Sequence, residues 1–273
     1  MIKNIVFSNL LVSLSASFLY SISCLFFDLK ILNELILIVF CSTFSFYNLI
    51  SLKSVNNMID IKREWILNNF NFIKMSTLLT AIISILLIIK LNLFTLLSPV
   101  IFLSLFYNYP IIELLNFKKN LRKIPFLKIF IIVFCWTYLT YLFPIFYNDL
   151  NFDVNVIIHL IIRSLFLFSI AINFDIRDKE SDLIVTIPTF LGQKKSKILS
   201  CSLLLICELL ALYLFIFHSL NFLCFLALYL TFEIGLILTY FINKNSKELY
   251  FSFYIESLSI LMFILVYIAT IIF

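Results

Sequence analysis

Long runs of apolar residues follow one another along almost the entire chain, separated by short polar breaks. Each run has about twenty residues, the length of α-helix that crosses the hydrocarbon core of a bilayer. Hydrophobic residues make up 63% of the chain and charged residues only 13%, roughly half the charge of a typical soluble domain. The sequence therefore predicts an all-α polytopic membrane protein.

The runs predict about nine transmembrane helices, which form a single transmembrane domain over residues 1–273. The connections between them are too short for a separate soluble domain. The first run follows a lysine, as in a signal peptide, but no hydrophilic domain follows it, so we expect a retained first helix. The spans are expected at roughly 5–27, 31–52, 72–89, 93–109, 127–147, 154–174, 197–217, 220–242 and 250–273.

Lysine and arginine residues are distributed very unevenly over the polar breaks. If the N-terminus and alternate breaks lie on one side, that side holds 17 cations and the other side holds 2. By the positive-inside rule, this split predicts a cytoplasmic N-terminus and an external C-terminus. Because the basic residues are spread over several segments, no nucleic-acid surface is expected. The abundance of Phe, Ile, Asn and Lys suggests an AT-rich bacterial genome, and hence a location in the bacterial inner (plasma) membrane.

The clearest departure from the apolar pattern is the segment DIRDKESD, which begins at Asp175 after the sixth span. If the helix continues, Asp175, Asp178 and Asp182 fall within about 60° of one another around its axis. Like charges on one stripe repel. A Mg²⁺ ion, which binds one or two carboxylates together with phosphate oxygens, relieves that repulsion. The alternative is a charged loop whose aspartates are neutralised by Arg177 and Lys179.

The residues after this segment add a second pattern. Thr186, Pro188 and Gly192 interrupt the chain before lysines open the seventh span, and free backbone N–H groups beside lysines can bind an anion. The stretch DIRDKESDLIVTIPTFLG resembles the second aspartate-rich motif of the UbiA-type intramembrane prenyltransferases, D-x2-D-x3-D followed by T-x-P-x3-G. The nine expected spans, the cytoplasmic N-terminus and the position of the motif after span six also match that family.

The first aspartate-rich motif of the family, N-D-x2-D-x3-D after the second span, has a degenerate counterpart here. The matching stretch is YNLISLKSVNN, in which Asn48 occupies the asparagine position. Its three aspartate positions are Leu49, Leu52 and Asn56. The resemblance is thus sharp over one motif and architectural over the remainder of the chain.

The resemblance implies an enzyme that transfers an isoprenoid chain from a prenyl diphosphate to an aromatic, quinoid or other lipid-soluble acceptor within the lipid bilayer. It implies Mg²⁺ as the cofactor, bound by the catalytic carboxylates Asp175, Asp178 and Asp182. Asp182 is either the third ligand or the base that activates the acceptor. The predicted substrate-binding residues are Asn48, Asn56, Arg122, Lys123, Arg177 and Lys194. Each cation among them is otherwise a residue that sets topology.

Three other functions remain open from the sequence. A catalytically impaired relative of the family would bind isoprenoid or quinone lipids without turnover, which the missing aspartates of the first motif favour. A secondary transporter commonly shows internal repeats and Gly- or Pro-interrupted helices, yet the chain has 2 glycines and no visible repeat. A phosphatidyl-group transferase of the CDP-alcohol type uses similarly spaced aspartates, but its D-G and A-R pairs are absent.

Four charged residues, Arg163, Glu208, Glu233 and Glu256, fall inside predicted spans. Such residues normally face a partner or a cavity, because the lipid interior solvates charge poorly. Arg163 and Glu208 lie at similar depth in consecutive spans, so we expect them to form an ion pair. A proton or ion pathway is the functional alternative.

Overall fold

The structure is a computed structural model that describes residues 2–55, 60–108, 121, 124–180, 184–218, 220–243 and 246–272. Within these residues, every regular element is a helix. Seven helical segments are long and apolar enough to cross a membrane, so the chain is an α-helical integral membrane protein, as predicted. They are α3 (Asn33–Lys53), α5 (Phe70–Lys90), the segment Leu127–Tyr147, α9 (Val154–Arg177), α11 (Gln193–Phe217), α12 (Phe222–Phe241) and the segment Tyr250–Ile272.

Two further apolar helices, α2 (Leu10–Phe26) and α6 (Phe94–Asn108), are shorter. Together with the seven long segments, they occupy the positions of the nine predicted runs. Two of the long segments contain a π-helical turn. One consists of α7 (Leu127–Thr137), η4 (Tyr138–Leu142) and α8 (Phe143–Tyr147), and the other of η6 (Tyr250–Ile255) and α13 (Ser257–Ile272).

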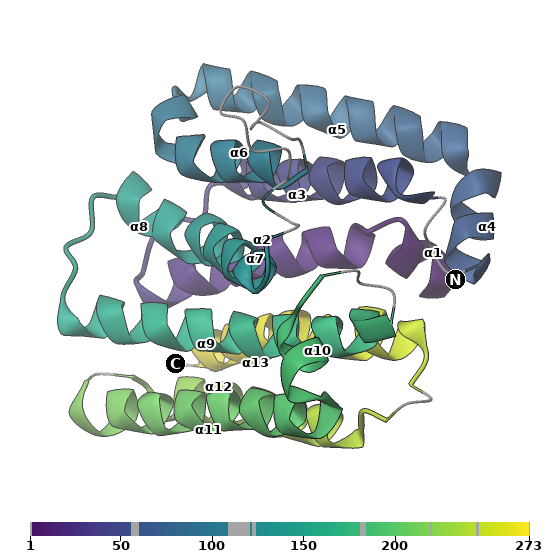
Figure 1. The fold of residues 1–273 in the computed structure, drawn as a ribbon. Helices are drawn as coiled ribbons and strands as arrows, with labels where there is room; N and C mark the ends of the chain where they lie inside the picture. Colours follow the sequence, from purple (N-terminus) through teal and green to yellow (C-terminus); the bar gives the residue numbers. More distant parts are fainter. Residues whose placement is uncertain are drawn as a thin grey trace.

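The long helices pack side by side (Figure 1). α5 packs on α3, and α3 packs on α2. From α2, a circuit of neighbouring helices runs through α13, α12, α11, α9 and α7, whose continuation η4 contacts α2 again. The largest apolar core lies within this circuit. Phe166 of α9 and Phe232 of α12 are fully buried there, with ring centroids 5.8 Å apart.

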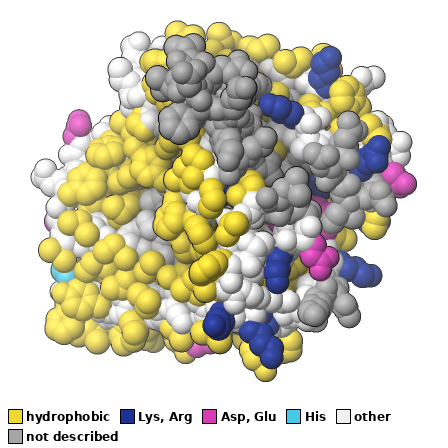
Figure 2. All heavy atoms as spheres, viewed as in Figure 1, with side chains coloured by type: hydrophobic (Ala, Val, Ile, Leu, Met, Phe, Trp, Pro, Cys, Tyr) yellow, Lys and Arg dark blue, Asp and Glu magenta, His cyan; other side chains and the backbone are white. Residues whose placement is uncertain are grey.

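The N-terminus and the short helix α4 (Asp60–Asn68) lie at one end of the bundle, where α9 also finishes (Figure 1). We call this the aspartate end. On the face drawn in Figure 2, most Lys and Arg side chains gather toward this end, whereas hydrophobic side chains cover much of the remaining surface. On this face, the basic and the apolar side chains are thus largely separated along the bundle.

The first predicted span is interrupted, which corrects the expectation of one helix over residues 5–27. α1 (Ile2–Phe7) ends before Asn9, whose backbone has a left-handed φ of 58°. The side-chain nitrogen Nδ2 of Asn9 donates to Asn48 Oδ1 at 2.9 Å and to Ser51 Oγ at 3.1 Å. Asparagine tolerates the left-handed conformation better than most residues, and the hydrogen bonds to α3 hold the break in place.

The predicted ion pair between Arg163 and Glu208 is wrong. The guanidinium of Arg163 turns toward α2 and η4, where it donates to the Leu19 carbonyl oxygen at 2.7 Å and to Thr140 Oγ1 at 3.3 Å. Glu208 lies near Glu233 of α12, a like charge, and its buried Oε1 has no hydrogen-bond partner among the described residues. Similar depth in consecutive helices does not fix the direction of a side chain around the helix axis, so the two groups face different neighbours.

Candidate functional site

The aspartate motif begins where α9 ends. The helix continues to Arg177 and is followed by a single 3-10 turn, η5 (Asp178–Glu180). The α-helix therefore does not continue through the motif, which was the condition for a stripe of three aspartates, because Asp178 already lies in the tighter turn that ends α9. Asp182 lies outside the described residues, so its direction stays a prediction.

Asp175 forms a buried ion pair with Lys128. Asp175 Oδ1 lies 2.8 Å from Nζ of Lys128, and only 8% of the Lys128 side chain and 6% of the Asp175 side chain are exposed. Lys128 stands in the first turn of α7. The Phe126 N–H, just before that helix, donates to the Val185 carbonyl oxygen at 3.1 Å, and the rings of Phe126 and Phe190 meet edge to face. The start of α7 is thus fastened to the segment that follows the motif.

Asp178 binds Arg177 with both carboxylate oxygens. Nε of Arg177 donates to Oδ1 at 2.6 Å, and Nη2 donates to Oδ2 at 3.0 Å. Nη1 donates to Ser252 Oγ of η6 at 3.1 Å, and the guanidinium lies over the Phe174 ring, 4.9 Å from its centroid. Bidentate pairs of this kind are the strong form of the Arg–carboxylate interaction. Arg177 therefore ties the end of α9 to the C-terminal helix.

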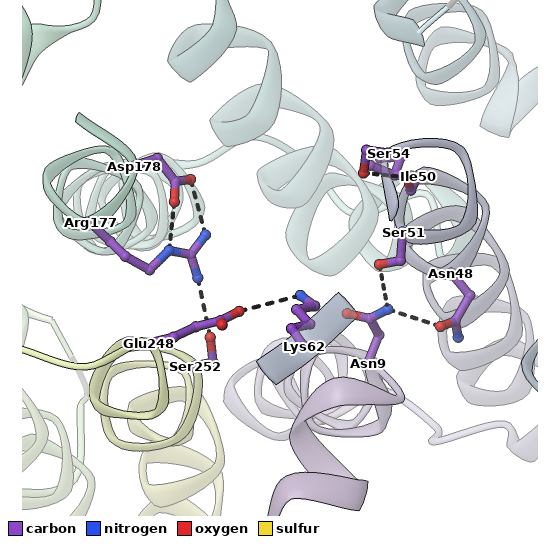
Figure 3. A network of polar contacts seen from close by, with 10 residues as sticks. All are labelled: Asn9, Asn48, Ile50, Ser51, Ser54, Lys62, Arg177, Asp178, Glu248 and Ser252. Atoms are coloured by element: carbon purple, nitrogen blue, oxygen red, sulfur yellow. Dashed lines mark hydrogen bonds and ion pairs between the residues drawn. The ribbon is translucent and has the colours of Figure 1, made fainter. Parts of the chain in front are cut away.

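A third ion pair joins Lys62 of α4 to Glu248, which precedes η6. Their Nζ and Oε1 atoms are 3.6 Å apart, and Figure 3 shows the Glu248 carboxylate pointing toward Lys62. Burial lowers the pKa of Lys62 below its ordinary value, while the attraction of Glu248 opposes that shift. Lys62 also interacts electrostatically with Arg177 and Asp178. The Lys62–Glu248 and Arg177–Asp178 ion pairs are therefore close enough to influence each other.

We call these paired residues the charged cluster: Lys62, Lys128, Asp175, Arg177, Asp178 and Glu248. Its cations and carboxylates neutralise one another, and they come from helices that meet only in the folded bundle. Among the described residues, no group of three or more His, Cys, Asp or Glu side chains could hold a metal ion. Two carboxylates suit Mg²⁺ only when phosphate oxygens and water complete its shell, and in this structure both Asp175 and Asp178 are instead paired with cations.

Asn48, the predicted substrate-binding residue on α3, is fully buried. Its Oδ1 accepts from the Asn9 side chain (Figure 3). Its Nδ2 donates to the Ser8 carbonyl oxygen at 3.0 Å. Leu49, at the first missing aspartate position, is 53% exposed. In this structure, Asn48 of the degenerate first motif thus stabilises the break between α1 and α2 through its hydrogen bonds to Ser8 and Asn9. A role of Asn48 in substrate binding stays a prediction.

Of the other predicted substrate-binding residues, the structure describes Lys194. Lys194 is exposed in the first turn of α11. Asn56, Arg122 and Lys123 fall outside the described residues, so their positions stay predictions. The structure therefore brings together Asp175, Asp178 and Arg177 of the predicted site.

The second half of the motif shapes the backbone. Thr186 caps α10 (Ile187–Leu191), and its N–H donates to Thr189 Oγ1 at 2.7 Å. Pro188 lies in the first turn of α10, where a missing N–H is tolerated. Gly192 has φ 80° and ψ 162°, a conformation open almost only to glycine, and it turns the chain from α10 into α11. These three residues direct the chain back into the bundle.

An apolar cavity of about 250 Å³ lies between α2, α3, α5, α6 and the α7–η4 segment. On α7, its lining includes Ile131, Ile132 and Cys135. These residues follow Lys128 by three, four and seven positions, so they share one face of the helix with it. On α7, the cavity lining therefore starts about one helical turn, roughly 5 Å along the axis, after Lys128.

Sequence reasoning missed four residues of this region: Lys62, Lys128, Glu248 and Ser252. In the sequence, the two lysines look like any cation that sets topology, and Glu248 and Ser252 are polar residues near the start of a span. Only Lys128 had a detectable signal, because it opens a span at helical spacing from a stripe of apolar residues.

The charged cluster and the cavity lining are about one helical turn apart along α7, and together they form the candidate site. Comparison of the chain with protein families, curated proteins and solved structures finds no match. The chemistry of the site's own residues therefore carries the functional inference. Paired charges and an apolar space follow each other along one helix, an arrangement suited to a ligand with an anionic head and a hydrophobic body.

Proposed function

We propose that this protein is a UbiA-type intramembrane prenyltransferase, which transfers an isoprenoid chain from a prenyl diphosphate to an aromatic, quinoid or other lipid-soluble acceptor. The observation that carries the proposal is the position of Lys128. It binds the motif residue Asp175 and shares a face of α7 with the cavity-lining residues Ile131, Ile132 and Cys135. A lipid whose head lies at the charged cluster can therefore place its chain in the cavity.

The charged cluster offers the contacts that a diphosphate needs. Lys128 and Arg177 carry several N–H donors, and phosphate oxygens accept such charge-assisted bonds strongly. When these cations turn to a diphosphate, the carboxylates of Asp175 and Asp178 become available to hold Mg²⁺, with Asp182 as a third ligand. Bound Mg²⁺ supplies positive charge that promotes departure of the diphosphate. The further substrate-binding residues in this proposal are Asn48, Asn56, Arg122, Lys123 and Lys194.

The proposed reaction breaks the bond between the first carbon of the chain and a diphosphate oxygen, whose electron pair leaves with the diphosphate. The acceptor forms the new bond to that carbon and releases a proton. Asp182 is the proposed base for that proton as the alternative to its role as the third ligand. The apolar cavity protects the allylic cation, because water would otherwise capture it.

The proposal includes a topology of nine spans in the UbiA arrangement, with a cytoplasmic N-terminus in a bacterial inner membrane. α2 has 17 residues and α6 has 15, somewhat fewer than the ~20 of an average span. In a variant lacking the native cysteines, a single cysteine at Lys30 should react with an impermeant maleimide added to intact cells. A cysteine at Lys3 should not react. Equal labelling at the two positions would show that α2 does not cross.

The function is tested by diphosphate release from the purified protein in lipid nanodiscs. Farnesyl, geranylgeranyl and longer polyprenyl diphosphates are offered with phenolic and quinoid acceptors, with and without Mg²⁺. We expect Mg²⁺-dependent release that falls about a hundredfold or more in Asp175→Asn and in Asp178→Asn. Glu180→Gln is the matched control, because Glu180 is an exposed carboxylate of the same segment. No release from any donor would contradict transfer.

Binding without turnover is the second candidate function, and two observations favour it. Leu49 and Leu52 replace carboxylates of the first motif, and Asp175 and Asp178 are both paired with cations. In this case the site would bind an isoprenoid diphosphate or a quinone lipid and leave it intact. Saturable binding of a radiolabelled prenyl diphosphate, weakened by Lys128→Gln and unaccompanied by release, would establish this function.

A further inference from the structure

Another cavity, much smaller than the first, lies in the half of the bundle away from the aspartate end. Its volume is about 20 Å³. Two polar residues of its lining, His159 and Arg163, stand in the first half of α9, which begins at the opposite end of the bundle from the aspartate end (Figure 1). Arg163 precedes Asp175 by twelve residues, about 18 Å along the helix. This cavity is therefore separate from the candidate site. Its lining also includes Phe26, Tyr141, Phe166 and Met262.

The guanidinium of Arg163 is a buried charge that has no charged partner among the described residues. Arg163 is 5% exposed. The hydrogen bonds found for it both run from Nη1 to neutral oxygens, the Leu19 carbonyl and Thr140 Oγ1, and the ion pairs of the described residues involve other cations. An arginine side chain stays charged in proteins, and an unpaired buried charge is costly. An anion that accepts from Nε and Nη2 would remove much of that cost.

His159 brings an unpartnered polar ring to the same cavity. It is 5% exposed, and within the described part of the chain neither ring nitrogen makes a hydrogen bond. The ring packs against Phe26 and Phe27, with centroids 4.7 and 5.4 Å away. His159 precedes Arg163 by one helical turn, so the two side chains lie on the same face of α9. A neutral imidazole carries one N–H donor, which adds a second donor group beside the guanidinium.

The other titratable groups around the cavity leave its charge positive. Asp153 and His218 act electrostatically on the histidine, and Tyr141 acts on Arg163. The Asp153 carboxylate caps the start of α9, where its Oδ1 accepts the Val156 N–H at 2.8 Å. The Tyr141 hydroxyl donates to the Val156 carbonyl oxygen at 2.6 Å. Both groups are thus held by the backbone of α9, and among the described residues neither forms an ion pair with Arg163.

We propose that Arg163 and His159 bind a small monovalent anion, a halide such as chloride, in this cavity. Buried N–H groups without acceptors and a buried positive charge are both compensated by such an ion. A volume of about 20 Å³ holds one species of roughly the size of a water molecule, so the cavity excludes phosphate, sulfate and a diphosphate. The ion would fix the charge balance where α9 packs on α2 and η4. This site is independent of the proposed prenyl transfer.

Binding of radioactive chloride to the purified protein in detergent micelles tests the site directly. In a gluconate buffer, we expect saturable binding of one chloride per chain, displaced by bromide. His159→Leu removes the N–H donor without adding bulk and should raise the dissociation constant about tenfold or more, because a hydrogen bond to a charged group is lost. Lys194→Met is the matched control. It removes an exposed cation and should change the dissociation constant less than about twofold.

Arg163→Met should abolish chloride binding. It should also abolish the rise in thermal stability that we expect when chloride replaces gluconate at constant ionic strength, since a ligand of the folded state stabilises it. Because Arg163 also contacts α2 and η4, this variant can misfold, and His159→Leu is then the deciding variant. Bromide-soaked crystals should show anomalous scattering between the two side chains. Absence of saturable binding, an unchanged dissociation constant in His159→Leu, or a bromide peak only elsewhere would overturn the inference and leave a water in the cavity.

Discussion

Nζ of Lys128 lies 2.8 Å from Oδ1 of Asp175, and both side chains are more than nine-tenths buried. The pair joins the first turn of α7 to the last turns of α9, so it holds the cavity-lining face of α7 in register with the aspartate motif. A buried ion pair contributes little net stability, but removing one partner leaves an uncompensated charge in a poorly solvating environment. Removing one partner therefore costs more stability than the intact pair contributes.

Removal of either partner alone should be strongly destabilising. Lys128→Met and Asp175→Asn are each expected to lower the free energy of unfolding by about 3–5 kcal/mol. The double variant should recover a large part of that loss, because no charge is then left unpaired. Reversible unfolding in mixed micelles measures all four proteins. Losses that simply add in the double variant would contradict a direct interaction.

The corresponding cycle on Arg163 and Glu208 should give no coupling. Arg163 donates to the Leu19 carbonyl oxygen and to Thr140, whereas Glu208 interacts electrostatically with Glu233. The effects of Arg163→Met and Glu208→Gln on the free energy of unfolding should therefore add to within about 0.5 kcal/mol. A larger coupling energy would restore the ion pair that the sequence predicts. The same unfolding assay serves for this cycle.

Lys62 should make stability depend on pH in the alkaline range. Burial lowers its pKa in the folded protein below the ordinary 10.5, with Arg177 adding to this and Glu248 opposing it. Between the lowered value and 10.5, the unfolded chain binds more protons, so the free energy of unfolding contributed by Lys62 rises with pH. Lys62→Met removes that rise. Unfolding curves measured from pH 7 to 10 test this, and parallel profiles for the two proteins would contradict it.

The two glycines of the chain should respond differently to alanine. Gly192 has φ 80°, so Gly192→Ala forces a side chain into a strained backbone conformation and should cost about 1–3 kcal/mol. Gly235 lies within α12, where an added Cβ would lie 3.1 Å from Leu204 Cδ1, the end of a flexible side chain. Gly235→Ala should change stability by less than about 1 kcal/mol, because better helix propensity offsets the crowding. Equal thermal shifts in the two variants would refute this account.

Much of the fold could be predicted without three-dimensional information. The helices Phe70–Lys90 and Gln193–Phe217 follow from long apolar runs bounded by polar residues. The proximity of Asp175, Asp178 and Arg177 follows from their closeness in sequence. The assumption of a continuous helix failed at two places. At Asp178, α9 has already ended one residue earlier. At Asn9, side chains of α3 stabilise a break in an otherwise apolar run.

The sequence by itself determined the class of protein and the positions of its long helices, because a segment in lipid must satisfy its backbone hydrogen bonds internally, which is a local requirement. The partners of individual side chains were decided only by the tertiary structure. Lys128 forms an ion pair with Asp175, which is 47 positions away in the chain. Arg163 donates a hydrogen bond to the Leu19 carbonyl oxygen and forms no ion pair with Glu208 among the described residues. Such contacts depend on the rotation of each helix about its axis, which is set by the simultaneous packing of all its neighbours.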